Sequence, residues 1–138
     1  MMIVDASVGL KWFIGEVDAG LAERLSLEHD LIAPTLFVSE LANGLWKATS
    51  RGVITQEQML ACIATLDVRI ERYLPDQEVV ERALEIAGKL DHPVYDCIYL
   101  AHCEREAVRL VTADQRLLRK LAGTAYVQHC VTLAELYP

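Results

Sequence analysis

Short runs of branched and apolar residues alternate along this chain with longer segments whose apolar residues recur at helical spacing. We expect strands at residues 2–4, 31–33, 70–73, 109–112 and 125–128. Strands separated by helices of about ten or more residues pair in parallel and are covered by helices on both faces. The sequence therefore predicts an α/β fold, a three-layer sandwich around a central, mainly parallel sheet of four to five strands.

The helical segments carry start and stop signals of their own. We expect them at residues 7–13, 19–28, 36–50, 55–67, 76–90, 93–107, 114–121 and 132–136. Thr55 and Gln58 have the spacing of a capping box, and Asp76 is placed to cap the segment that follows it. No linker, repeat or low-complexity tract interrupts the pattern, and the 138 residues suit a single domain over 1–138.

The charge of the chain excludes one way of binding nucleic acid. The sequence has 13 Lys and Arg against 20 Asp and Glu, which gives a formal net charge of −7. Binding through a broad basic surface needs many Lys and Arg side chains on phosphates, and this chain does not have that surplus. A nuclease that holds its phosphates through metal ions is still compatible with this charge.

The sequence predicts a cytoplasmic protein without membrane contact. No apolar run approaches the roughly 18–20 residues that a membrane span needs. The N-terminus lacks the basic region and the long apolar region of a signal peptide. The four cysteines show no CxxC spacing, so we expect them to be small apolar residues rather than zinc ligands or disulfide partners.

Four acidic residues stand in apolar surroundings close to the expected strand ends. Asp5 directly follows the first strand, and Asp114 comes just after the fourth. Glu40 lies in the helix after the second strand, and Asp96 lies in the first helical turn after Pro93. Ligands of parallel sheets bind beyond the carboxyl ends of the strands. Carboxylates gathered there would repel one another without a hard divalent cation such as Mg²⁺ or Mn²⁺.

Each of these residues also has an ordinary structural explanation. Asp5 and Asp114 could simply cap the helices that follow them. Glu40 could be a solvated helix residue, and Asp96 could pair with a nearby cation or interact with the dipole of its helix. The joint placement of all four in this order of strands and helices favours a metal site.

Four motifs in the same order resemble those of a known family. They are MIVDASVGLKWF, PTLFVSELAN, YDCIYLA and LVTADQRL, and together they reach from residue 2 to at least residue 121. The sequence resembles the PIN-domain ribonucleases, and among them the VapC-type toxins of toxin–antitoxin modules. The resemblance implies a PIN-like fold, an Mg²⁺-dependent endoribonuclease with Mn²⁺ as an alternative ion, and one or two bound ions.

The resemblance also implies roles for particular residues. The catalytic metal ligands would be Asp5, Glu40, Asp96 and Asp114, and the supporting polar residues would be Ser7, Asn43 and Thr112. Some PIN domains have a further acid a few positions after the last Asp, where this chain has Leu117 and Leu118. The implied partners are the RNA substrate, an antitoxin protein that blocks the site, and a second copy of the chain in a homodimer.

Other interpretations compete with this one. The motif after the first strand lacks the D-x-D of dehalogenase-like phosphatases, because Asp5 is followed by Ala6 and Ser7. A response-regulator receiver would need a late Lys, and residues 127–129 provide none. A catalytically silent PIN-like protein that only binds RNA or a partner remains the main alternative.

Basic residues near the motifs are candidates for guiding RNA phosphates, but the ordinary expectation for each is a plain surface charge, because most Lys and Arg side chains are exposed. They are Lys11, Lys47, Arg51 and Arg116.

Overall fold

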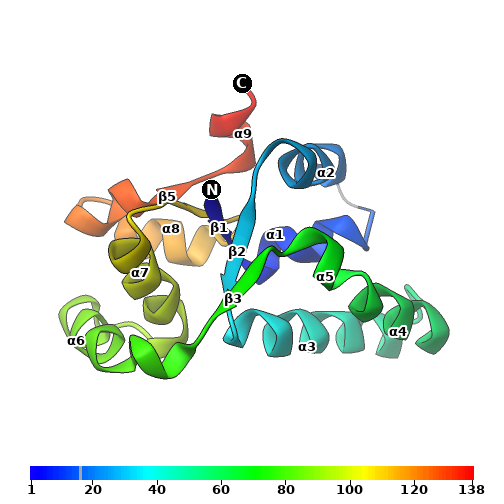
Figure 1. Ribbon diagram of the computed structural model, residues 1–138, viewed down its shortest axis with the longest axis horizontal. Coiled ribbons are helices and arrows are strands. Elements are labelled where there is room, and N and C mark those ends of the chain that lie inside the picture. The colour runs from blue at the N-terminus through cyan, green and yellow to red at the C-terminus, as the bar shows by residue number, and fades with distance from the viewer. Residues whose placement is uncertain (16) are drawn as a thin grey trace.

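A computed structural model of the chain describes residues 1–15 and 17–138. Five strands form one sheet in the order β3-β2-β1-β4-β5, and all four neighbouring pairs are parallel (Figure 1). The strands are β1 (Met2–Val4), β2 (Leu31–Pro34), β3 (Arg72–Leu74), β4 (Leu110–Val111) and β5 (Cys130–Val131). The predicted α/β class and parallel sheet are confirmed.

The strand order places β1 at the centre of the sheet. From β1 the chain moves outward through β2 to β3, and it then returns to the other side of β1 to form β4 and β5. The order therefore reverses between β1 and β4, where Ile3 is in register with Leu110 and Val4 with Val111. A crevice beyond the carboxyl ends of two such strands is the usual ligand site of parallel sheets. Asp5 follows β1 at this position.

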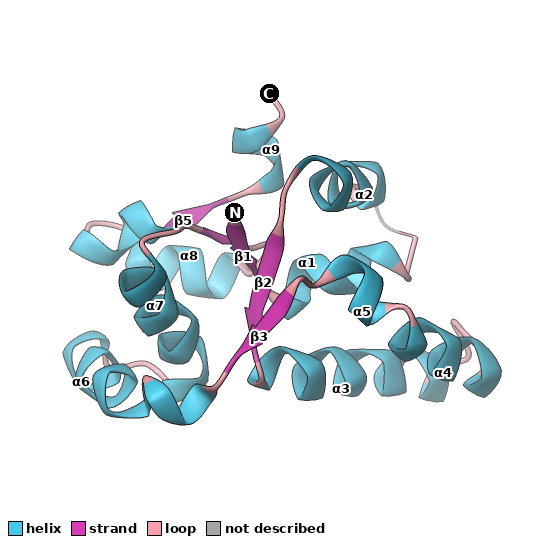
Figure 2. Cartoon of the chain, viewed as in Figure 1, coloured by secondary structure: helices cyan, strands magenta, loops and turns pink. Residues whose placement is uncertain are grey.

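Helices surround the sheet (Figure 2). In the view of Figure 1, α6 and α7 lie on one side of β2 and β3, and α1 and α5 lie on the other. The α-helices are α1 (Ala6–Gly9), α2 (Ala19–Glu28), α3 (Leu36–Ser50), α4 (Gln56–Ala64), α5 (Leu66–Arg69), α6 (Val80–Leu90), α7 (Val94–Glu106), α8 (Gln115–Leu121) and α9 (Leu133–Leu136). The 3-10 helices are η1 (Leu10–Trp12), η2 (Asp76–Glu78) and η3 (Ala125–His129).

Helix α7 crosses the core. Its residues from Cys97 to Cys103 are all buried, which explains why the sequence there shows little helical amphipathicity. Cys97 and Cys103 are buried and Cys62 and Cys130 half-buried, and all four are free thiols, as predicted. Among the helices of residues 1–15 and 17–138, none has both the length and the apolar content required to cross a bilayer.

Several predicted boundaries were wrong. The fifth strand is Cys130–Val131 rather than 125–128, because the chain first reaches β4 at Cys130, and the preceding residues form η3. The helix expected over 55–67 is divided at Thr65, whose hydroxyl donates to the carbonyl oxygen of Cys62. The Thr55–Gln58 capping box is confirmed.

The third strand and the helix after it also begin later than predicted. The strand covers Arg72–Leu74 rather than 70–73, in register with Ile32, Ala33 and Pro34 of β2. Asp76 makes no side-chain cap, because residues 76–78 form the 3-10 turn η2 and α6 begins only at Val80.

Candidate active site

Asp5 is the buried acid at the centre of the site. It follows β1, and its side chain is only 7% exposed. The hydroxyls of Ser7 and Thr112 both donate to its Oδ2, at 2.6 and 2.7 Å. Burial raises the pKa of Asp5, whereas these two hydrogen bonds lower it and the nearby Asp96 and Asp114 add to the rise. Although Asp5 occupies the N-cap position of α1, its carboxylate does not cap that helix.

Glu40 reaches the site from α3, which starts directly after β2. The phenol of Tyr99 on α7 donates to Glu40 Oε1 at 2.8 Å. Partial burial raises the pKa of Glu40 to about 7, the Tyr99 hydrogen bond opposes that rise, and the charge of Asp5 adds to it. Glu40 is therefore not the solvated helix residue that was one alternative from the sequence.

Asp96 lies in the first turn of α7 and is bonded to a histidine. Its Oδ2 is 2.5 Å from Nε2 of His92, whose side chain is 5% exposed. The pairing of Asp96 with a nearby group, left open by the sequence, is thus present, and the partner is a histidine rather than Lys or Arg. His92 and Asp96 are four residues apart in sequence, but they do not lie on one helix, because His92 precedes α7 and Pro93 stands between.

Asp114 follows β4 and caps α8. Its Oδ1 accepts hydrogen bonds from the backbone amides of Arg116 and Leu117, at 2.9 and 3.1 Å. Its own backbone amide donates to the hydroxyl of Thr112 at 3.1 Å. Thr112 therefore connects Asp5 and Asp114 directly, and the capping role considered for Asp114 is confirmed.

The four acids line one hollow. Asp5, Glu40, Asp96 and Asp114 all contribute to a cavity of about 440 Å³, which Ser7 and Asn43 also line. A neighbouring hollow of about 500 Å³ shares Glu40, Asn43, Asp96 and Asp114 with it. Side chains from four separate segments of the chain are thus brought together as the strand order requires.

In each of these four carboxylates one oxygen takes part in a hydrogen bond, and we call it engaged. The other oxygen does not, and we call it open. The engaged atoms are Asp5 Oδ2, Glu40 Oε1, Asp96 Oδ2 and Asp114 Oδ1. Within residues 1–15 and 17–138, no hydrogen bond is made by the second oxygen of any of the four. Hard divalent ions take carboxylate oxygens, so this donor set suits Mg²⁺ or Mn²⁺.

The four acids line one hollow without surrounding a single ion position. In the described part of the chain, no three acidic, histidine or cysteine side chains are already arranged around one ion position. Three of the four hold a neighbouring side chain in a hydrogen bond, and the fourth caps a helix. Ion binding would therefore require small side-chain movements that bring the open oxygens together.

The supporting residues are only partly as expected. Ser7 and Thr112 both bond to Asp5, and their hydroxyl oxygens lie 3.5 Å apart. Asn43 lines the hollow one helical turn after Glu40. In the described residues it makes no hydrogen bond to any of the four acids.

Sequence reasoning missed Tyr99 and His92. A signal existed for each, because Tyr99 follows Asp96 by three residues on the same helix and His92 precedes it by four.

Of the predicted phosphate guides, Lys47 and Arg51 line the 440 Å³ hollow and Arg116 lines the neighbouring one. Lys11 lines neither, and its ammonium lies 3.9 Å from Asp18.

Comparison with known proteins identifies the family. The model of the PIN domain matches residues 2–123. Ribonuclease VapC3 of Pyrobaculum aerophilum is 30% identical over 125 residues, which cover 86% of this chain and 93% of the relative. Ribonuclease VapC9 of Mycobacterium tuberculosis is 33% identical over 118 residues, covering 85% of this chain and 88% of that protein.

Solved structures have the same fold. A crystal structure from Pyrobaculum aerophilum matches with a TM-score of 0.72 at 22% identity, over 98% of this chain and 85% of that one. A toxin–antitoxin complex from Klebsiella pneumoniae matches with a TM-score of 0.70 at 17% identity, over 96% and 98% of the two chains. Divalent-metal dependence is general among PIN-domain ribonucleases. The chain belongs to the PIN-domain family and, within it, to the VapC-type ribonucleases.

Proposed function

We propose that this chain is an endoribonuclease toxin that hydrolyses RNA phosphodiester bonds with Mg²⁺, or Mn²⁺ in its place, held by Asp5, Glu40, Asp96 and Asp114. The observation that carries the proposal is the open oxygen on each of these four acids around one hollow. In the described residues no Lys or Arg forms an ion pair with any of them. A cation from solution is therefore needed to balance their charge.

Each residue has a definite task in this mechanism. A bound divalent ion would supply Lewis-acid stabilisation of the phosphate and a water of lowered pKa. Ser7 and Thr112 fix the Asp5 carboxylate through its Oδ2 and leave Oδ1 for the ion. Tyr99 and His92 do the same for Glu40 and Asp96. Four ionised acids carry four negative charges, which supports one or two ions rather than more.

The chemistry determines the expected products. Attack by water does not use the ribose 2′-hydroxyl, so we expect a 3′-hydroxyl and a 5′-phosphate. A 2′,3′-cyclic phosphate on the product would contradict this mechanism.

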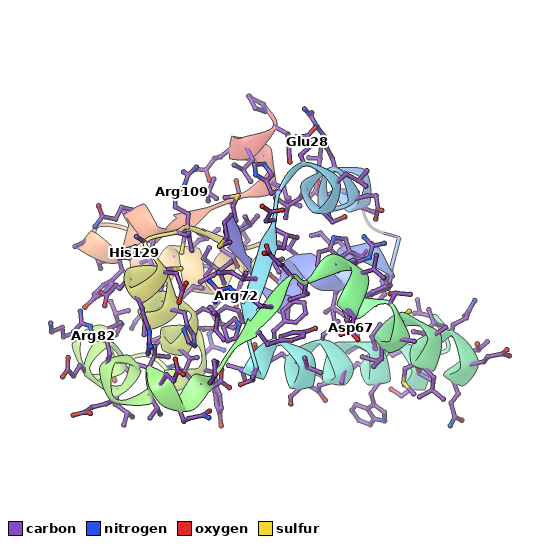
Figure 3. The ribbon with its side chains drawn as sticks, in the orientation of Figure 1. Glu28, Asp67, Arg72, Arg82, Arg109 and His129 are labelled. Carbon is purple, nitrogen blue, oxygen red and sulfur yellow. The ribbon has the colours of Figure 1, made fainter. Side chains whose placement is uncertain are left out.

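The experiment compares wild type with Asp5→Asn and Asp96→Asn on cellular RNA, with and without Mg²⁺ or Mn²⁺. Asp67→Asn is the matched control, because Asp67, labelled in Figure 3, is an acid of α5 that lines neither hollow. We expect cleavage by wild type and Asp67→Asn only with metal, and a loss of at least about 100-fold in both site variants. Full activity in both site variants would overturn the assignment.

The silent PIN-like alternative predicts a different outcome of the same assay. A protein that only binds RNA or a partner would show no metal-dependent cleavage in wild type. Its four acids would then have no reason to keep open oxygens around one cavity, which is what favours the enzyme.

We also propose an antitoxin partner and self-association as a homodimer in the cytoplasm, where the RNA is. Solved structures of similar fold include a toxin–antitoxin complex and a VapBC2 assembly from Rickettsia felis. The acidic hollow would accept a basic segment of an inhibitor. Helices α3 and α4 and the loop between them expose Trp46, Val53 and Leu60, each more than half exposed, and these are candidates for the dimer contact.

We further propose that residues 1–138 form one domain, since the family model matches nearly all of them.

A further inference from the structure

The basic side chains of this acidic protein fall into two groups. Six of them are in ion pairs with acids: Lys11, Arg24, Arg69, Arg72, Arg82 and Arg105. The other seven have no ion pair within residues 1–15 and 17–138: Lys47, Arg51, Lys89, Arg109, Arg116, Arg119 and Lys120. With 20 acids available to 13 basic residues, a shortage of acidic partners does not explain the second group.

Five of those seven cations line the acidic hollow or a hollow beside it. Lys47 and Arg51, at the end of α3, line the hollow of about 440 Å³. Arg116, Arg119 and Lys120, which we call the α8 basic face, line another hollow of about 350 Å³, whose other lining residues are Asp91, His92 and Pro93. By contrast, the paired Arg82, labelled in Figure 3, reaches from α6 to Glu104 of α7.

The hollow at the α8 basic face adjoins the acidic one. His92, Pro93 and Arg116 line both the 350 Å³ hollow and the 500 Å³ hollow that Glu40, Asp96 and Asp114 also line. A ligand in the 500 Å³ hollow that passes these three shared residues would therefore reach the α8 basic face.

The α8 basic face is electrostatically unfavourable in isolation. Arg116 is three residues from Arg119 and four from Lys120, so it shares a helix face with both, and like charges on one face repel. The helix dipole favours Arg119 and Lys120 in the last turn of α8, but it disfavours Arg116 in the first. A bound anion would remove this repulsion.

We propose that the α8 basic face binds backbone phosphates of the RNA on one side of the bond that is cleaved. The inference rests on the proposed function and adds a substrate subsite to it. In RNA, a phosphate in the acidic hollow is covalently followed by further phosphates, and the adjoining hollow places the α8 basic face within their path. The guanidinium groups of Arg116 and Arg119 match phosphate oxygens in two-pronged geometry.

The test compares two double variants with the same change in charge. Arg119→Gln with Lys120→Gln removes two charges from the α8 basic face. Lys89→Gln with Arg109→Gln removes two unpaired charges elsewhere, since Lys89 is on α6 and Arg109 precedes β4 at the amino-terminal edge of the sheet (Figure 3). Binding of a short fluorescein-labelled single-stranded RNA is measured in an Asp5→Asn background, so that the RNA stays intact.

We expect the α8 double variant to bind this RNA about 10-fold more weakly and to lower the slope of log Kd against log salt by about 1.4, or about 0.7 per lost contact. The control double variant should change both values much less. The two double variants are also made with Asp5 intact. These active proteins should cleave bis(p-nitrophenyl) phosphate, which is too small to reach α8, at the same rate as each other.

The outcomes separate this inference from the proposed function. If wild type cleaves neither RNA nor the small diester with any divalent metal, the proposed function fails. If wild type cleaves RNA and the two double variants bind and cleave it equally, the function stands and the α8 subsite is wrong. If the α8 variant loses affinity for poly-glutamate but not for RNA, the face receives an acidic protein segment, which also overturns the proposal.

Discussion

Tyr99 joins the two helices of the active site by donating its phenolic proton to Oε1 of Glu40 over 2.8 Å. The donor side chain is 1% exposed, so water does not compete for the bond. Glu40 is thereby held in the hollow. Burial and the nearby acids raise its pKa, this bond is the one main influence that lowers it, and the net value is about 7. If Glu40 holds a metal ion as we propose, the strength of metal binding near neutral pH depends on Tyr99 as well.

Replacing Tyr99 by Phe should shift metal binding to higher pH. Without the hydrogen bond the pKa of Glu40 rises further, so more alkaline solution is needed to ionise it. We expect weaker Mn²⁺ binding at neutral pH, recovery at alkaline pH, and a stability loss of about 1 kcal/mol. Calorimetric titration with Mn²⁺ across pH measures this, with Tyr73→Phe in β3 as the control. An unchanged pH profile would contradict the role of Tyr99.

The metal-free protein should lose stability as pH rises from about 4.5 to about 7. The folded state holds the Glu40 proton up to about pH 7, whereas the unfolded chain releases it near the usual value of 4.5. The folded state therefore binds more protons in this window, and its advantage is lost as pH rises. Urea unfolding in EDTA should show this fall in wild type and a smaller one in Glu40→Gln. Equal pH dependence in both proteins would be evidence against it.

Asp5→Asn should stabilise the metal-free protein while abolishing cleavage. Burial raises the pKa of Asp5, which means that its ionised form is costly in the empty hollow. An amide removes that cost, and the hydroxyls of Ser7 and Thr112 can rotate to suit it. We expect a gain of about 1 kcal/mol above neutral pH in EDTA. Thermal unfolding with and without Mg²⁺ checks this, since only wild type should be stabilised strongly by the metal.

His92 should act on metal affinity through Asp96. Its ring is 5% exposed and 2.5 Å from Asp96 Oδ2, so it fixes the orientation of that carboxylate. We expect His92→Leu to weaken Mn²⁺ binding by about 10–100-fold, as is typical when the hydrogen-bond partner of a ligand is removed. His92→Gln, which keeps a donor, should weaken it less.

The matched control for this prediction is His102→Leu. His102 is buried on α7, the helix that carries Asp96, and neither of its ring nitrogens has a partner among the described residues. The His102→Leu variant should bind Mn²⁺ with the same affinity as wild type. If both Leu variants weaken Mn²⁺ equally, the effect arises from general disturbance of α7.

The sequence predicted the parts of the fold that local pattern determines. Strand β1 ends at Val4 and α3 covers residues 36–50 as expected, because each has a clear apolar pattern. The segment 125–128 was misassigned, since its apolar residues also suit a strand and only pairing with β4 places the true strand at Cys130.

The acids of the site could be predicted because strand ends converge in a parallel sheet. Their partners could not, because a bond such as Tyr99 to Glu40 depends on how two helices pack. The same holds for the α8 basic face, where the absence of ion pairs among the described residues becomes visible only in three dimensions.

The bond between Thr112 and Asp5 spans 107 residues of sequence. While the protein is being synthesised, Asp5 leaves the ribosome early and has neither Thr112 nor the β4 strand beside it. Asp96 and Asp114 also come from the later part of the chain. A nascent chain therefore has no complete hollow until β4 has been made and has paired with β1.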